Sequence, residues 1–303
     1  MNASNSQNQT NLRESVSVLL IAVAIGAAIG NVITVERVYE PSLSRQPSAA
    51  SSPYPPWPAV RPNPTPLLRS NDRSRWATIR ALVDEGTYVI GKRDKARATP
   101  ENPNAGDTGI VFEDGWQSVD KVLRPDTQEF FSSKPPLLPT ILAGEYWLLK
   151  YGFGWSLTSD PSRWWVVRVI LLTVNVLPFA VYLILLNRLS RRLGATDWGG
   201  LFVIAAACFG TFMTAFAGAL NNHVIAACGC LFALTPALTA VFGRPEQDTG
   251  WRYALAGFFA AVTACNDLPA AAFAAALLGV LLQHSPKKTL MWFVPAAALP
   301  VAA

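Results

Sequence analysis

Residues 15–35 read SVSVLLIAVAIGAAIGNVITV and contain no charged side chain. A helix rises about 1.5 Å per residue, so these 21 residues are long enough to cross about 30 Å of hydrocarbon. The run is also longer than the apolar part of a cleavable secretion signal, which favours an uncleaved anchor. The stretch therefore predicts a first transmembrane helix behind a short N-terminal segment, residues 1–14.

Charged residues are unevenly distributed along the 303-residue chain. They make up 15% of the sequence, whereas a soluble domain carries about 25%. Of the 45 charged residues, 27 lie within residues 36–134. The basic residues are interleaved with acidic ones or flank apolar runs, so the net charge of +5 does not predict a nucleic-acid partner. The composition argues against a soluble enzyme and indicates a polar segment between membrane-embedded ones.

Apolar runs continue after the polar segment and raise the number of candidate spans to seven. The last run is about 15 residues long and falls short of a full crossing, so we expect the chain to be the N-terminal portion of a longer protein. The predicted fold is an all-α membrane protein, a multi-pass helical bundle with a large extracytoplasmic first loop. The six further runs are residues 164–187, 198–217, 224–242, 251–265, 268–282 and 289–303.

Basic residues in the short connections predict the orientation. They cluster at residues 188–192, around Arg244 and Arg252, and at residues 287–288, whereas residues 218–223 and 266–267 carry none. Short loops rich in Lys and Arg stay in the cytoplasm, while long loops escape this rule. We therefore expect a plasma (inner) membrane protein with a cytoplasmic N-terminus and an extracytoplasmic loop over residues 36–163.

The outer loop has two parts. Residues 36–70 form a proline-rich spacer, and residues 71–163 form the folded part. In the folded part, the period of apolar residues predicts an amphipathic helix over 73–83, and GTYVIG, GIVFEDG and EFF predict short strands or extended pieces. Residues 135–151 contain Pro139 and Glu145, so we interpret them as a helix lying in the membrane interface rather than a span.

Three polar positions in this pattern are candidates for chemistry. Asp72 precedes the amphipathic helix, where a carboxylate either caps the helix or takes a proton from a hydroxyl acceptor. Lys134 enters the interfacial helix, where it either snorkels or binds an anion. Arg168 lies inside an apolar run, where a guanidinium is costly and either marks a functional site or snorkels outward to the membrane surface. The four cysteines all fall in apolar runs, so neither a disulfide framework nor a metal site is predicted.

Four motifs occur in a suggestive order: NDRSRWATIRALVDEGTYVI, SSKPPLLPTILAGEYWLLKYGFG, RWWVVRVILL and RLSRRLG. In this order they resemble the GT-C class of membrane glycosyltransferases, in the branch of protein O-mannosyltransferases and aminoarabinose transferases. The resemblance implies transfer of a sugar from a polyprenyl-phosphate donor to an acceptor on the outer face, the acceptor being a protein, lipid or glycan. It also implies Asp72 as general base, with Lys134 and Arg168 binding the donor phosphate.

Further residues are candidates for accessory roles. Asp84 and Glu85 form a second acidic pair at the far end of the amphipathic helix, and Asn71 precedes Asp72. His223 and Asp267 lie on predicted outer connections and so face the same side as Asp72. The sequence does not identify a cofactor. The outer loop contains no DxD-type acidic pair, which favours a metal-independent reaction but does not exclude a divalent cation.

Two other functions are compatible with the sequence. A multi-pass transporter would use the helix break at residues 266–269. A membrane-anchored envelope-binding protein would use Asp72 only as a cap. The enzyme predicts that Asp72, Lys134 and Arg168 converge, whereas the transporter predicts a site centred on Asp267.

Overall fold

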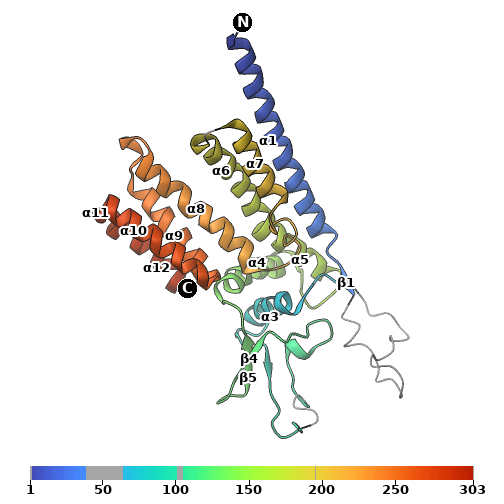
Figure 1. Cartoon of the computed structure of the whole chain (residues 1–303). Coiled ribbons are helices and arrows are strands. Elements are labelled where there is room, and N and C mark those ends of the chain that lie inside the picture. Colours follow the sequence, from blue (N-terminus) through green and yellow to red (C-terminus); the bar gives the residue numbers. More distant parts are fainter. Residues whose placement is uncertain (1, 39–63, 101–104, 195, 303) are drawn as a thin grey trace. The chain divides into compact units, whose positions relative to one another are not determined.

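The computed structural model describes residues 2–38, 64–100, 105–194 and 196–302 (Figure 1). The chain divides into two compact units. We call Met1–Val32 with Leu171–Ala303 the helical unit, and Ile33–Ile170 the mixed unit. Most of the proline-rich spacer predicted at residues 36–70 lies outside the described residues.

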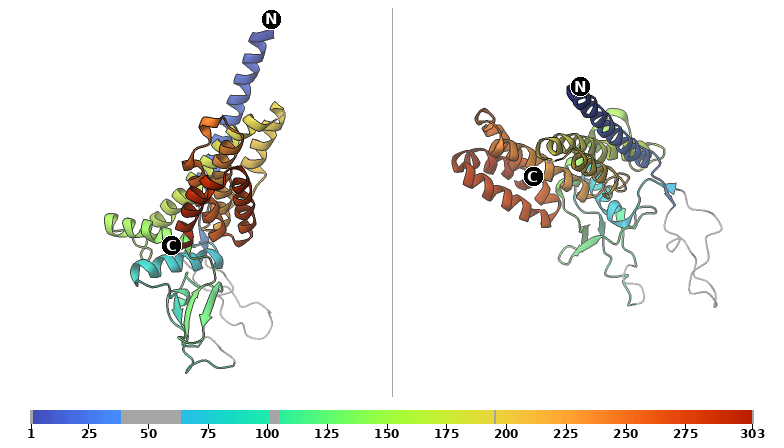
Figure 2. Two further views of the ribbon diagram at one scale, coloured as in Figure 1. Left: turned by 90° about the vertical axis from the view of Figure 1, so that its left-hand side faces the viewer. Right: turned by 45° about the horizontal axis from the view of Figure 1, so that its top comes forward.

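The helical unit consists of helices that run back and forth and pack side by side (Figures 1 and 2). Short π-helices, Leu172–Val176 and Thr289–Phe293, precede α6 and α12, and the 3₁₀ turns Pro245–Gln247 and Leu268–Ala270 lie in two connections. The helices are α1 (Asn2–Ile33), α6 (Leu177–Leu193), α7 (Asp197–Phe209), α8 (Asn222–Phe242), α9 (Gly250–Asn266), α10 (Ala271–His284), α11 (Pro286–Lys288) and α12 (Val294–Ala302).

Three helical stretches are long and apolar enough to cross a membrane: Leu12–Ile33, Ser162–Leu193 and Asn222–Phe242. Together with the mostly helical content, they agree with the predicted all-α membrane protein. Each corresponds to a run predicted from the sequence as a span. Asp197–Phe209 and Leu268–His284 are apolar but shorter, so the predicted number of seven full spans is not reproduced by helix length.

The largest difference from the predicted spans lies at residues 198–217, where α7 already ends at Phe209. Asparagine side chains hold the irregular backbone that follows. Asn31 of α1 donates to the carbonyl of Thr214 (2.9 Å). Asn175 of the π-helix donates to the carbonyls of Ala217 and Ala219 (2.9 Å each). These bonds satisfy backbone groups that a continued helix would have paired internally.

Small residues pack α8 closely against α9, and α9 against α12. A Cβ at Gly229 would collide with the hydroxyl of Thr263, and one at Gly257 would collide with the backbone of Phe293. Small side chains let helix backbones approach where lipid supplies no hydrophobic driving force. The buried cluster here consists of Ala233, Ala237, Ala240, Tyr253, Ala256, Ala260, Leu277, Leu281 and Phe293.

The mixed unit combines helices with two small antiparallel sheets. Among the segments predicted to be strands or extended, EFF lies in β5 and GTYVIG leads into β3, but residues 110–112 form a 3₁₀ turn instead. Strand β4 was not predicted. The elements are β1 (Arg37–Val38) paired with β2 (Pro64–Thr65), a sheet in the order β3 (Gly91–Lys92), β5 (Glu129–Ser132), β4 (Lys121–Arg124), and helices α3 (Ser70–Asp84), α4 (Leu137–Phe153) and α5 (Ser162–Leu171).

Helix α4 has a buried face and an exposed apolar face. Leu138, Leu142 and Tyr146 are buried, and Gly154 ends the helix with a φ of 71°. An apolar, partly aromatic exposed face suits the headgroup region of a bilayer, which is the position predicted for residues 135–151. The large exposed side chains of α4 are Ile141, Trp147, Leu148, Tyr151 and Phe153.

Candidate functional site: a series of charges beside helix α3

Asp72 lies in the first turn of α3 and is almost fully buried, at 4% exposure. Its Oδ2 accepts a hydrogen bond from the backbone N–H of Leu68 (2.9 Å), and its Oδ1 accepts one from the indole N–H of Trp76 (3.0 Å). A carboxylate in the first turn also complements the positive end of the helix dipole. Asp72 therefore stabilises the helix start, and its environment holds a carboxylate in a buried position.

Two arginines beside Asp72 are buried, and the sequence reasoning did not single them out. Arg73 and Arg75 are 2% and 1% exposed. A guanidinium of Arg75 donates to the backbone carbonyl of Asn71 (3.1 Å) and to its side-chain amide oxygen. Burial lowers the pKa of Arg75, and the charges of Asp72 and Asp120 oppose that shift. Arg75 thus lies within electrostatic reach of two carboxylates.

Lys134 forms an ion pair with Asp120, with 2.7 Å between Nζ and Oδ1. Burial by itself would raise the pKa of Asp120. Hydrogen bonds from Lys134 and Ser70, with the charges of Lys134 and Arg75, bring that pKa below its ordinary value. The backbone of Asp120 is fixed as well, because its carbonyl accepts the hydroxyl of Ser74 (2.6 Å).

Serine hydroxyls tie the surrounding segments to α3. Ser70 bonds Ser118 (3.1 Å between the hydroxyl oxygens), and Ser74 bonds Ser132 (2.7 Å). Ser132 also accepts the backbone N–H of Lys134 (3.2 Å). The loop before β4 and the end of β5 are therefore held against the first half of the helix.

Together these contacts define a series of alternating charges, Asp72, Arg75, Asp120 and Lys134, which we call the α3 charge series. With Arg73 beside it, the group carries one more positive than negative charge. Asp72 and Lys134, both predicted site residues, thus belong to one electrostatic network. A signal for it exists in the sequence, since Asp72 and Arg75 are three residues apart on one helix face.

Arg168 lies elsewhere in the mixed unit, on α5. Its guanidinium is over the rings of Trp164 and Trp165, 5.4 and 5.8 Å from their centroids. Its Nε atom is buried and has no hydrogen-bond partner among the described residues. Arg168 therefore contacts aromatic rings of its own helix and does not join the α3 charge series through any contact in the described structure.

The second acidic pair has a different environment. Asp84 accepts hydrogen bonds from Lys150 (2.8 Å) and Tyr146 (3.3 Å) of α4, so it fastens the end of α3 to α4. Glu85 is exposed at the end of the helix. These contacts give Asp84 a structural role.

The predicted outer connections of the helical unit also carry a polar cluster. His223 Nδ1 lies 2.8 Å from Asp267 Oδ2, with the two side chains 66% and 27% exposed. Next to them, Asn222 donates to the backbone carbonyl of Asn266 (2.6 Å). The start of α8 and the end of α9 thus present a histidine–carboxylate pair.

Among the described residues, no three His, Cys, Asp or Glu side chains gather in a way that could hold a metal ion. The four cysteines are free thiols.

Comparison with known proteins gives no relative: no protein-family model, curated protein or solved structure matches this chain.

Proposed function

We propose that the chain is a membrane glycosyltransferase that moves a sugar from a polyprenyl-phosphate donor to an acceptor on the outer face. The observation that carries the proposal is the α3 charge series, in which Asp72 and Lys134 share one network with Arg75 and Asp120. Such a transfer needs a carboxylate to deprotonate the attacking hydroxyl and cations to stabilise the leaving phosphate. Asp72 is the proposed base and Lys134 a proposed phosphate ligand. Arg168 is proposed as the second phosphate ligand from the sequence motif alone, because no contact in the described residues joins it to the α3 charge series.

The distribution of charge in the helical unit supports the proposed orientation. Over residues 12–32 and 171–302, seven of the eight Lys and Arg residues occur at or beside helix ends, and the eighth, Arg13, lies inside α1 and pairs with Asp197 at the start of α7. Contacts join these ends: Arg192 of α6 donates to the carbonyl of Phe242 at the end of α8 (3.2 Å). Lys288 of α11 donates to Asp248 between α8 and α9 (2.6 Å). By the positive-inside rule we place this basic end, together with the N-terminus, on the cytoplasmic face of the plasma membrane.

In this orientation the C-terminal end of α1 lies on the outer face of the membrane. The mixed unit follows that end in the chain, so we place it outside the cell membrane as well. The exposed apolar face of α4 fits the outer membrane interface, where a lipid-linked donor is available. The finer topology of seven spans is part of the same proposal, with α7, α9, α10 and α12 inserted as short or paired helices.

The test is transfer from a radiolabelled mixture of polyprenyl-phosphate sugars in membranes that contain the full chain. We compare wild type with Asp72→Asn, which keeps the size and one acceptor oxygen but removes the base. The matched control is Asp126→Asn, because Asp126 is exposed in the turn between β4 and β5.

Loss of transfer in Asp72→Asn, at wild-type abundance and with Asp126→Asn active, would support the proposal. Transfer that is equal in all three proteins would show that Asp72 is not the base. Absence of transfer by wild type from every donor would count against the glycosyltransferase.

A second candidate function, a transporter, is favoured by the His223–Asp267 pair and the helix break behind it. A transporter exposes its central site alternately to the two sides of the membrane. In Asp267→Cys, labelling by an impermeant thiol reagent from both sides would support transport, whereas labelling from one side only would favour the enzyme.

A further inference from the structure

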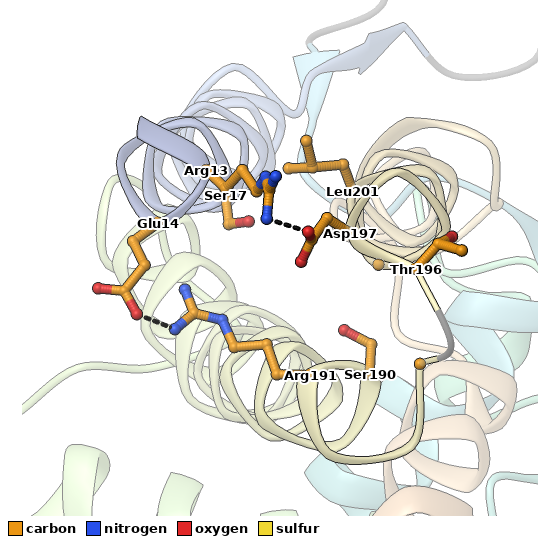
Figure 3. Close-up of a pocket in the computed structure, with 10 residues that line it drawn as sticks. Arg13, Glu14, Ser17, Ser190, Arg191, Thr196, Asp197 and Leu201 are labelled. Atoms are coloured by element: carbon orange, nitrogen blue, oxygen red, sulfur yellow. Dashed lines mark hydrogen bonds and ion pairs between the residues drawn. The ribbon is translucent and has the colours of Figure 1, made fainter. Parts of the chain in front are cut away.

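A pocket of about 240 Å³ lies at the basic end of the helical unit, between α1, α6 and α7 (Figure 3). None of its lining residues has a role in the proposed transfer reaction. Its polar lining residues are Arg13, Glu14, Ser17, Ser190, Arg191, Thr196 and Asp197.

Two ion pairs between helices cross the pocket. Arg13 of α1 pairs with Asp197 of α7, and Glu14 of α1 pairs with Arg191 of α6 (Figure 3). All four side chains are partly exposed, so each pair by itself contributes little stability. Each guanidinium has five N–H donors and can bind a second anion while keeping its carboxylate. The pocket therefore offers two cations and two anions to a ligand.

The inner wall of the pocket has an unused polar group. Ser17 is only 5% exposed, lines the pocket, and its hydroxyl makes no hydrogen bond with any part of the chain that the structure describes. Opposite it, α7 begins: Thr196 accepts the backbone N–H of Gly199 (3.1 Å), so the positive end of the helix opens beside the two arginines. The hydroxyl of Ser17 is therefore available to donate to a ligand in the pocket.

An apolar groove of about 270 Å³ adjoins the pocket and shares three lining residues with it, Ser190, Gly194 and Gly200. The groove runs between α6 and α7, and its walls are apolar. Gly200 leaves open space in the groove, because a Cβ there would have no close neighbour. The apolar wall consists of Leu186, Leu189, Leu193 and Val203.

We propose that the pocket and groove bind an aminophospholipid, a lipid whose headgroup carries both a phosphate and a primary ammonium group. The phosphate lies between Arg13 and Arg191 beside the start of α7, and Ser17 donates to it. The ammonium lies between Glu14 and Asp197, and an acyl chain follows the apolar groove. A soluble anion would use the arginines but leave both carboxylates and the groove unused, so a lipid fits the whole site better.

The test measures binding of three lipids to the delipidated full chain in detergent, by native mass spectrometry. The lipids share the same acyl chains and carry phosphoethanolamine, phosphocholine or phosphoglycerol. Choline carries no N–H donor for the carboxylates, and glycerol carries no positive charge. We expect phosphoethanolamine to bind about tenfold more tightly than the other two, a difference of about 1.4 kcal/mol.

Three variants locate the site. Arg191→Gln removes a phosphate ligand, Glu14→Gln removes an ammonium ligand, and Gly200→Leu fills the pocket without changing its charge. A Cβ at Gly200 meets only the hydroxyl of Ser190, at 3.9 Å, so this variant is expected to fold. The control is Arg244→Gln, an exposed arginine of the same basic end that does not line the pocket.

The proposal holds if Gly200→Leu and Arg191→Gln each reduce phosphoethanolamine binding about tenfold while Arg244→Gln does not. Glu14→Gln should remove the preference for phosphoethanolamine over phosphocholine. Equal or tighter binding of the phosphoglycerol lipid by wild type would overturn the ammonium half of the site. Binding that Gly200→Leu leaves unchanged, with the variant monodisperse on size exclusion, would place the lipid elsewhere and overturn the proposal.

Discussion

The ion pair between Lys134 and Asp120 offers the sharpest test of the α3 charge series. Lys134→Met keeps most of the side-chain volume and removes the charge. Both side chains are partly buried, at 19% and 23% exposure, and the change leaves the carboxylate of Asp120 with one partner fewer. Asp120 keeps Ser70 and the charge of Arg75, so we expect a loss of about 1–3 kcal/mol, as for a charged hydrogen bond, rather than the full cost of an isolated buried charge.

The sign of the pH dependence follows from Asp120. Its pKa in the folded chain lies below the ordinary value of 3.8, so the pair contributes stability that is fully present above about pH 5. That contribution is lost as the pH falls through the lowered pKa of the folded state. The difference between wild type and Lys134→Met should therefore be largest near pH 7 and should shrink towards pH 3.

Hydrogen exchange of the peptides that cover residues 118–134 measures this difference, after correction for intrinsic exchange at each pH. The matched control is Lys92→Met in the adjoining three-stranded sheet, because Lys92 is 67% exposed and lies 3.7 Å from Glu129. A surface pair of this kind contributes about 0–1 kcal/mol. Equal losses in the two variants, or a loss in Lys134→Met that does not change between pH 7 and pH 3, would refute the reasoning.

Three further predictions concern the helical unit. Gly229→Ala should destabilise the protein in detergent by about 1–3 kcal/mol, because the added Cβ meets Thr263. Gly279→Ala is the control, since a Cβ there has no neighbour within 4 Å. Equal melting temperatures of the two variants would contradict the close packing of α8 on α9. Asn175→Leu removes the hydrogen bonds to the carbonyls of residues 217 and 219, so we expect it to lower the free energy of unfolding by about 1–3 kcal/mol and to speed hydrogen exchange around these residues. Asn187→Leu is the control, and unchanged exchange in Asn175→Leu would contradict the role of the asparagine contacts. Burial alone would raise the pKa of Asp248, but hydrogen bonds from Lys288 and Tyr253 bring that pKa below its ordinary value of 3.8. The contact between Asp248 and Lys288 should therefore be fully formed above about pH 4 and weaken as the pH falls through the lowered pKa. After correction for intrinsic exchange at each pH, hydrogen exchange of residues 285–289 should accelerate at low pH in wild type. It should be fast at every pH with Asp248→Asn but not with Glu246→Gln, and corrected exchange that does not depend on pH would disprove the prediction.

The asparagine contacts explain where sequence reasoning about the spans reached its limit. Residues 198–217 are apolar throughout, and run length alone predicts one continuous helix. The helix ends at Phe209 because side chains from other helices, Asn31 and Asn175, hold the backbone that follows. Such contacts depend on which helices are neighbours, and apolar periodicity does not report that.

The candidate site shows the same limit. Asp72 and Lys134 were found from the sequence because a carboxylate at a helix start and a lysine at an interface are local patterns. Burial of Arg73 and Arg75 was not predicted, because charged residues on an amphipathic helix are expected on its exposed face. The partner of Lys134, Asp120, comes from the loop before β4, a strand that was also missed.

The sequence by itself determined the membrane class, the position of the first span, and helices α3 and α4, because run length, helical period and terminating glycines act over a few neighbouring residues. Only the tertiary structure decided which charges meet. Glu14 and Arg191 are 177 residues apart in the chain and form one wall of the pocket, and His223 meets Asp267 across 44 residues. Pairings over such separations are set by how the helices pack, because packing fixes the distance between side chains that the chain alone leaves free.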